Sequence, residues 1–356
     1  MMLIAVVVIA LAVTAGCGKV SFDENAWRQQ ILSADRTLLY AEHLGEDGLF
    51  FNPWLPQGKR GGTLKNGLRL RFSPPDNLTE FSEDSYRAVE NAYEYLSDDT
   101  KSRISFAGHA SFIIQMDSKV IFTDPFFSKK AFIVNKDVVI DFDFSKVPDK
   151  PVALISHNHY DHLDEYSVKK LADKDALFIV PLKLKEFLVK LGAKNVYELD
   201  WWEELEIEGI KYTFLPSQHW SRRLWQTGGS TLWGGFMIEG SYSVYFSGDS
   251  GYFVGFKEFG EKFSIDYAIV GVGAYMPRWF MHYSHLNVNE FFDAADDLQA
   301  KITIPMHLGV IKLGKEPILY PLYEIGKYID ENPKYNNKVR PLRAGEYLDM
   351  GEDVNE

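Results

Sequence analysis

Cysteine is nearly absent from this chain of 356 residues, in which Cys17 stands alone. One cysteine cannot form a disulfide within the chain, and its place near the N-terminus leaves no thiolate for a metal site in the folded domain. Any metal centre must therefore be built from histidine and carboxylate side chains.

The chain also lacks a block of lysine and arginine, and its formal net charge is −12. Because nucleic acids are held mainly by clustered basic residues, this balance disfavours a nucleic-acid partner. A phospholipid is not excluded, since a local aromatic surface can meet a membrane substrate. With 46% hydrophobic residues and no internal repeat, the sequence is that of a globular protein with a sizeable core.

The N-terminal apolar run, residues 3–13, is shorter than the ~20 residues that span a bilayer, which argues against an uncleaved anchor. Small residues lead from it to Cys17, a pattern that resembles a bacterial lipoprotein signal. We therefore expect residues 1–16 to be a signal peptide and Cys17 to be acylated. The protein would then be a membrane-anchored lipoprotein of the cell envelope, facing outside the cytoplasm.

Residues 17–100 are rich in proline and glycine clusters and include one expected helix at 83–96. This part of the chain is interpreted as an extension that wraps a main domain at 101–350. The alternative, an independent small domain, lacks a convincing apolar pattern of its own.

The main domain alternates short apolar runs with helical stretches, and Asp117-Ser118 is typical of a hairpin turn. Two strand-rich halves, each with helices, predict an α/β fold in which two sheets pack face to face and helices cover them outside. Strands are expected at 104–106, 111–116, 120–123, 151–155, 176–180, 196–199, 210–215, 231–238, 242–247, 267–271 and 302–305, and helices at 167–173, 182–191 and 287–299.

The segment 156–164 holds three histidines and two aspartates directly after an apolar run. Open α/β folds place their chemistry at such strand ends. His157 and His159 alternate along an extended backbone and point the same way, while Asp161 and His162 continue into the turn. This geometry suits two metal ions close together. Structural histidines are the alternative, but three of the nine histidines in the chain lie here.

Three more candidate ligands, His219, Asp249 and His307, each follow a predicted strand. Alone, a loop histidine or a Gly-Asp turn is more often structural. Their joint position after successive strands favours one metal centre at one edge, between the two sheets.

The series formed by these residues resembles the ligand set of the metallo-β-lactamase superfamily, whose fold is an αββα sandwich. The resemblance implies that His157, His159 and His219 hold one divalent ion, that Asp161, His162 and His307 hold another, and that Asp249 bridges them. Zn²⁺ is the expected ion, with Fe and Mn as alternatives. By the same resemblance, His109 and Asp124 support the ligands from behind, Asp124 by orienting a histidine.

Within the superfamily, the segments 156–164, 199–204, 216–220, 248–252 and 273–281 closely resemble the phospholipases D that hydrolyse N-acyl-phosphatidylethanolamine. The implied reaction is attack of a metal-bridged hydroxide on phosphorus, giving phosphatidic acid and an N-acylethanolamine. Asp161 and His285 are the implied catalytic residues. His285 would bind phosphate or give a proton to the leaving group; an exposed loop histidine is the alternative.

Four aromatic residues near His285 are expected to line an acyl-chain pocket or to meet a membrane, although such a stretch can also be core. Arg222 and Arg223, just after His219, could hold phosphate, or they could be a solvated pair. The expected partners are a phospholipid substrate and a membrane surface reached through lipidated Cys17, with a homodimer as a further possibility. The four aromatic residues are Tyr275, Trp279, Phe280 and Tyr283.

Several other functions use the same fold. A β-lactamase with a cysteine ligand is excluded by the place of Cys17, and an RNA-processing nuclease is disfavoured by the acidic balance. A sugar-phosphate lactonase and a broader lipid phosphodiesterase remain open. From a different class, a non-catalytic, metal-stabilised envelope lipoprotein is the alternative.

Overall fold

The computed structural model describes residues 22–55, residues 101–352 and a few single positions between these ranges (70, 78, 88–89, 93 and 96). The predicted signal at 1–16, Cys17 and most of the predicted helix at 83–96 lie outside the described residues. Among the described residues, no helix is long and apolar enough to cross a bilayer.

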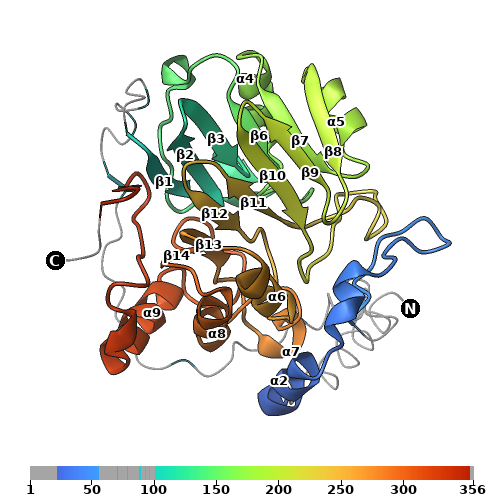
Figure 1. Ribbon diagram of the computed structural model, residues 1–356, viewed down its shortest axis with the longest axis vertical. Coiled ribbons are helices and arrows are strands. Elements are labelled where there is room, and N and C mark those ends of the chain that lie inside the picture. The colour runs from blue at the N-terminus through green and yellow to red at the C-terminus, as the bar shows by residue number, and fades with distance from the viewer. Residues whose placement is uncertain are drawn as a thin grey trace, which may run out of the picture.

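The first sheet has seven strands in the order β15-β1-β2-β3-β6-β7-β8. Strands β3, β6, β7 and β8 are parallel, and parallel neighbours need crossover connections. Helices α4 (Glu165–Ala172) and α5 (Lys185–Lys190) supply two of these and cover the outer face (Figure 1). The strands are β1 (Arg103–Gly108), β2 (Ser111–Met116), β3 (Lys119–Thr123), β6 (Val152–Leu154), β7 (Leu177–Pro181), β8 (Asn195–Leu199) and β15 (Tyr347–Asp349).

The second sheet has six strands in the order β14-β13-β12-β11-β10-β9, and β12, β13 and β14 are parallel. Helices α6 (Gly255–Lys262), α8 (Val288–Leu298) and α9 (Tyr320–Glu331) cover its outer face (Figure 1). The strands are β9 (Glu204–Ile207), β10 (Ile210–Leu215), β11 (Gly235–Glu239), β12 (Ser243–Phe246), β13 (Tyr267–Gly271) and β14 (Ile302–Met306). The short elements outside both sheets are β4 (Lys130–Ala131), β5 (Val134–Asn135), α7 (Arg278–Met281), and the 3₁₀ helices at Phe144–Lys146 and Pro333–Tyr335.

Each sheet contributes an aromatic pair from two neighbouring strands to the core of the sandwich. Phe106 and Phe112 of the first sheet have ring centroids 5.0 Å apart, and Phe214 and Phe236 of the second have centroids 4.9 Å apart. All four side chains are fully buried in one continuous core. Burial of one such ring contributes about 1.5–3 kcal/mol. The predicted αββα sandwich is confirmed.

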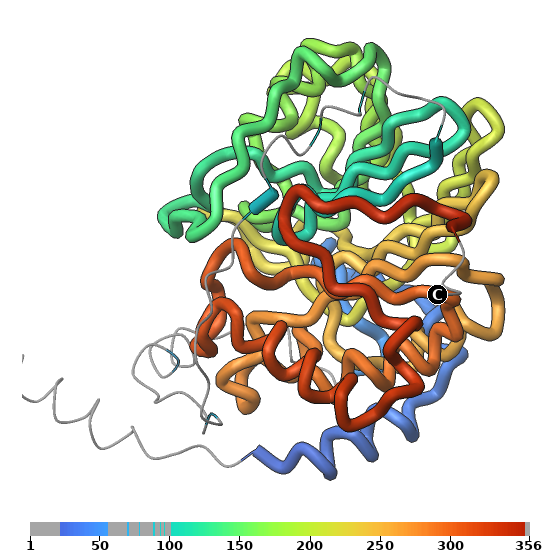
Figure 2. The backbone as a smooth tube through the Cα atoms, turned by 90° about the vertical axis from the view of Figure 1, so that its left-hand side faces the viewer, coloured from blue at the N-terminus to red at the C-terminus, as the bar shows by residue number. Residues whose placement is uncertain are grey.

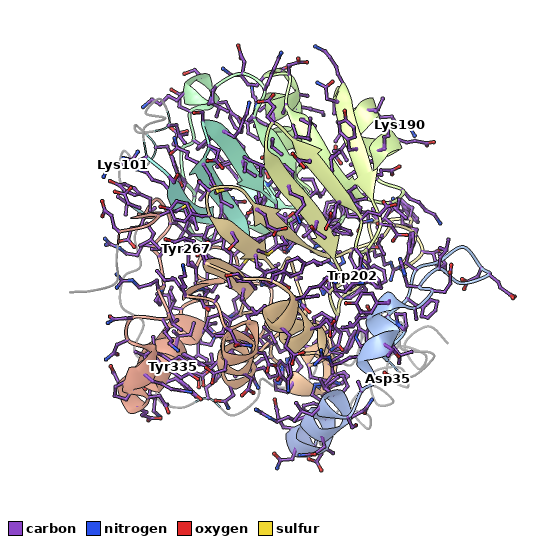
Figure 3. All side chains as sticks on the ribbon, in the orientation of Figure 1. Asp35, Lys101, Lys190, Trp202, Tyr267 and Tyr335 are labelled. Carbon is purple, nitrogen blue, oxygen red and sulfur yellow. The ribbon has the colours of Figure 1, made fainter. Side chains whose placement is uncertain are left out.

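The N-terminal segment packs on the side of the second sheet. Its helix α2 (Glu24–Leu32) buries Trp27 and Ile31 in the main core, and a 3₁₀ helix (Arg36–Tyr40) follows. Trp202, labelled in Figure 3, stacks on Tyr40 at 4.5 Å and donates a hydrogen bond to the carbonyl of Leu39. Residues 22–55 are therefore part of the same packed body as the main domain.

Most predicted strands lie within a residue or two of the observed ones, with one clear exception. Strand β11 begins at Gly235 and not at 231, and a Cβ on Gly234 would lie 2.3 Å from the carbonyl oxygen of Leu215. Close backbone approach therefore explains the glycines where a strand was expected. Helices α2, α6 and α9 were not predicted, and the C-terminal segment returns to the first sheet as β15 (red in Figure 2).

Replacing Phe236 with alanine should lower the free energy of unfolding by ~3–5 kcal/mol, because the cavity lies between two sheets that cannot close it. Urea denaturation in the presence of a chelator measures this without a contribution from metal. Tyr197→Ala, at a half-exposed position on edge strand β8, should change stability by about 0.5 kcal/mol or less. Equal losses in the two variants would contradict the assignment of the core.

Candidate metal centre

The candidate ligands all follow strands whose ends meet at one edge of the sandwich. His157 and His159 come after β6, His219 after β10, Asp249 after β12 and His307 after β14. Three of these strands run in parallel segments, and carboxyl ends of parallel strands share an edge. The fold thus gathers side chains that are up to 150 positions apart in the chain.

The first cluster consists of His157, His159, His219 and Asp249, whose ligand atoms all lie within 4.8 Å of one another. His159 Nδ1 is 2.8 Å from His157 Nε2 and 3.2 Å from His219 Nε2. Asp249 Oδ2 is 3.7 Å from His219 Nε2 and 3.9 Å from His157 Nε2. Three imidazoles and one carboxylate therefore converge on one point, as ligands of a zinc-like ion do.

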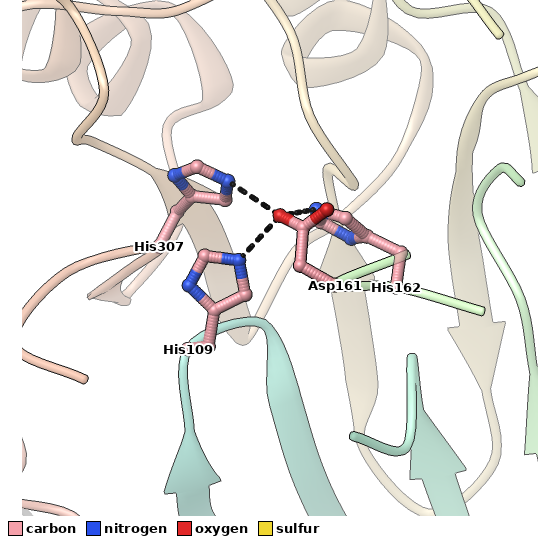
Figure 4. Close-up of side chains that lie close together, drawn as sticks. All are labelled: His109, Asp161, His162 and His307. Carbon is pink, nitrogen blue, oxygen red and sulfur yellow. Dashed lines mark hydrogen bonds and ion pairs between the residues drawn. The ribbon is translucent and has the colours of Figure 1, made fainter. Parts of the chain in front are cut away.

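The second cluster consists of Asp161, His162, His307 and His109 (Figure 4). Asp161 Oδ2 lies 2.8 Å from His109 Nε2, 3.3 Å from His162 Nε2 and 3.6 Å from His307 Nε2. Asp249 Oδ2 reaches this cluster as well, at 3.2 Å from His162 Nε2 and 3.3 Å from His307 Nε2. Asp249 therefore stands between the two clusters.

Several polar atoms of the centre have no hydrogen-bond partner within the described part of the chain. They include Nε2 of His159, His162 and His307, and Oδ1 of Asp249, all buried. A buried polar atom without a partner is costly, and a cation would satisfy all of these at once. The donor set of imidazole nitrogens and carboxylate oxygens fits divalent metal ions.

The two clusters differ in the charge that their histidines prefer without metal. Burial lowers the pKa of His157 and His219 well below the usual value, and lowers that of His159 to about 4. In the second cluster burial acts in the same direction, but the facing carboxylates raise the pKa of His307 to about 9 and that of His162 well above its usual value. Because metal ligation requires neutral imidazole, a cation here competes with protons mainly at His162 and His307.

Asp124 holds one ligand in place from behind. Its Oδ2 lies 2.7 Å from His162 Nδ1, and its Oδ1 accepts a 2.6 Å hydrogen bond from the backbone N–H of Ser156. A carboxylate on the far ring nitrogen fixes both the tautomer and the orientation of a metal-binding histidine. The other support residue, His109, lies deeper in the centre than expected, because its Nε2 contacts Asp161 directly.

Arg223 braces the histidine segment, a role that the sequence did not indicate. It is 7% exposed, and its Nη1 donates to the carbonyls of Asn158 and Leu163, at 3.0 and 2.9 Å. Its guanidinium also lies 4.0 Å from the centre of the Tyr160 ring. The interpretation of Arg222 and Arg223 as a solvated pair is therefore wrong for Arg223, while Arg222 is exposed.

The N-terminal segment also reaches the centre. Asn52 Nδ2 donates to the carbonyl of His219 at 2.9 Å, and Trp54 Nε1 donates to Gln218 Oε1 at 3.0 Å. Gln218 Nε2 in turn donates to the carbonyl of Tyr283 at 3.0 Å. These bonds link three distant segments behind one ligand.

His285 lies beside the ligands, with its ring centroid 5.3 Å from that of His219 and 5.2 Å from that of His307. One of its ring nitrogens belongs to a third group of potential ligand atoms, with Asp249 and His307. Burial lowers the pKa of His285 to about 3, which favours a neutral imidazole. A neutral ring still donates one hydrogen bond, so these surroundings suit phosphate binding better than proton transfer.

The predicted substrate contacts divide into two groups. Trp279, Phe280 and Tyr283 are partly exposed in or after α7. Tyr275 is only 2% exposed, its hydroxyl donates to Glu324 Oε2 at 2.5 Å, and its backbone N–H donates to the buried Glu316. The prediction that Tyr275 contacts substrate is therefore corrected: its ring packs in the core toward α9.

Comparison with known proteins agrees with this geometry. The family described as Beta-lactamase superfamily domain matches residues 120–308. A protein of Veillonella parvula described as a possible metal-dependent hydrolase has a similar structure, with a TM-score of 0.59 at 16% identity, covering 70% of this chain and 100% of that one. The chain belongs to the metallo-β-lactamase superfamily and is a metal-dependent hydrolase.

Two curated relatives share a more specific name. N-acyl-phosphatidylethanolamine-hydrolyzing phospholipase D 1 of Caenorhabditis elegans is 31% identical over 72% of this chain and 78% of its own length. The mitochondrial protein of the same name in Saccharomyces cerevisiae is 33% identical over 56% of this chain, but the match spans only 46% of the yeast protein.

Asp124→Asn should lower metal affinity by ~10- to 100-fold, because it removes the carboxylate that orients His162. Competition with a chromogenic chelator measures this change. Asp200→Asn is the matched control, since Asp200 pairs with His43 at 2.7 Å outside the two clusters. Equal affinities in the Asp124 variant and the unmodified protein would show that Asp124 has no orienting role.

Proposed function

We propose that the protein is a phospholipase D that hydrolyses N-acyl-phosphatidylethanolamine to phosphatidic acid and an N-acylethanolamine. The observation that carries this proposal is the pair of ligand clusters joined by Asp249, with His285 at their side. Two relatives with 31% and 33% identity that bear this name support the choice of substrate.

The position of each residue in the two clusters indicates the ion that it would hold. His157, His159 and His219 would hold one ion, Asp161, His162 and His307 a second, and Asp249 would contact both. Zn²⁺ is the ion that we propose, because the ligands are mainly imidazole. When bound, divalent ions at such a centre lower the pKa of a water molecule and neutralise charge on phosphate.

The remaining chemistry concerns the phosphodiester. A water oxygen forms a bond to phosphorus as one of its O–H bonds breaks, the bond from phosphorus to the ethanolamide oxygen breaks, and that oxygen takes up the proton that the water has lost. His285 holds a phosphate oxygen by its N–H, next to the ligands His219 and His307. Arg278 Nη1, which lies 3.2 Å from the carbonyl of His285, keeps this loop in position.

We also propose that the protein lies at a membrane of the cell envelope. An acylated Cys17 would tether the protein to a membrane of the cell envelope, on the side away from the cytoplasm, next to its phospholipid substrate. Since one acyl chain gives only marginal binding, a lipoprotein-type anchor with more than one chain would be needed for stable attachment.

The purified protein should release N-acylethanolamine from N-acyl-phosphatidylethanolamine, lose this activity in chelator, and regain it when metal is restored. Phosphatidylcholine and a lactone, assayed in parallel, test the two rival activities of this fold, a broad lipid phosphodiesterase and a lactonase. Failure to release ethanolamide with any metal supplement would refute the assignment. If turnover is absent on all three substrates while metal remains bound, a non-catalytic metal-stabilised protein is favoured.

His285→Ala should lower kcat by ~10²- to 10³-fold, as loss of one hydrogen-bond donor to the reacting phosphate predicts, while the bound metal is unchanged. His285→Gln, which keeps an N–H donor, should recover part of the loss if hydrogen bonding to phosphate is the role. Metal content by mass spectrometry is measured on each variant. A loss of metal in both would instead make His285 a ligand.

A further inference from the structure

The loops around the metal centre have an unusual charge for this chain. The protein has 50 acidic and 38 basic residues, yet four segments that contain or adjoin the centre have no aspartate or glutamate. Three lysines lie in the segment 125–136, which directly follows Asp124. Exposed cations on this face include Lys129, Lys130, Arg222 and Lys312. The four segments are 125–136, 218–238, 276–289 and 307–315.

Large apolar side chains project into solvent from two of these segments. Trp225 is 94% exposed, Ile133 78%, Leu224 52% and Phe132 47%. Phe132 stacks on Tyr160 at 4.9 Å, and the backbone N–H of Leu224 donates to the Tyr160 hydroxyl at 3.1 Å. The β4–β5 hairpin and the 224–225 loop therefore meet over Tyr160, between the ligands His159 and Asp161. We call these five residues the apolar rim.

The apolar rim is held in its outward position. The backbone of Phe132 has φ 50° and that of Trp225 has φ 65°, a left-handed conformation that bulky residues rarely adopt. Arg223 fixes Tyr160 from below through its contact with the ring and its bonds to the loop carbonyls. Backbone strain that places two aromatic rings in water is a reason to look for a partner that covers them.

We propose that the apolar rim docks on the surface of an anionic phospholipid bilayer, with Lys129, Lys130 and Arg222 meeting lipid phosphates. Tryptophan favours the membrane interface, and cations near an anionic surface each add to the attraction. A second copy of the chain fits less well, because it would bring like charges together. Docking would bring the metal centre to its substrate only if the proposed lipid hydrolysis is right. The docking itself does not depend on that hydrolysis.

The single native cysteine makes a direct test possible. In full-length protein carrying Cys17→Ser, a cysteine is placed at Ile133, at Trp225 or at the half-exposed control position Tyr197 on β8, and is labelled with an environment-sensitive fluorophore. With vesicles of phosphatidylcholine and phosphatidylglycerol, labels at 133 and 225 should shift to shorter wavelength and be quenched by brominated lipid. The label at 197 should do neither, and salt should weaken the response.

A second measurement uses unlabelled protein. Each of Trp225→Ser and Ile133→Ser should lower vesicle affinity by about tenfold in flotation, as loss of one buried apolar side chain predicts. Tyr197→Ser should leave it unchanged.

Two results would overturn the proposal: labels at 133 and 225 that ignore vesicles, or labels that respond to protein concentration alone, which would indicate self-association. Because these vesicles contain no N-acyl-phosphatidylethanolamine, either result leaves the proposed hydrolysis standing. Vesicle docking without any hydrolysis of N-acyl-phosphatidylethanolamine would refute the proposed hydrolysis and leave the docking proposal standing.

Discussion

The metal centre depends on the contacts that the Asp249 carboxylate makes with histidines of both clusters. Its Oδ2 lies within 3.9 Å of ring nitrogens from both clusters, so one negative charge faces imidazoles that would otherwise be buried side by side without compensation. It can stand there because β12 ends at Phe246, between β11 and β13, at the edge where the other strands also end. The sandwich fold and the metal centre are thus two consequences of the same strand arrangement.

The ligand positions could be predicted because each is a local pattern: a short apolar run followed by histidine or aspartate. Most of the supporting contacts could not; the orienting role of Asp124 is the exception, because the family resemblance implies it. Arg223, Gln218 and Glu316 act on residues 40 or more positions away, and nothing in their immediate sequence distinguishes them from solvated side chains. Tyr275 shows the opposite failure, since its neighbours suggested a substrate pocket while tertiary packing turned its ring toward Glu324.

The start of strand β11 was mispredicted for a related reason, because it depends on contacts between segments that are distant in the sequence. Residues 231–234 have the composition of a strand, but Gly234 and Gly235 are where two neighbouring backbones approach too closely for a side chain. Strand boundaries near the centre are therefore set by close contacts between neighbouring strands of the second sheet, and the same contacts hold the loops that carry His219 and Asp249.

The hydrogen bonds from Trp54 to Gln218 and from Gln218 to Tyr283 show that the part of the chain that supports the metal centre is larger than the family match. The family match begins at residue 120, but hydrogen bonds that support His219 originate at residues 52 and 54. The metal centre and residues 22–55 are consequently one mechanical piece. A displacement of residues 22–55 is therefore passed directly to the loop that carries His219.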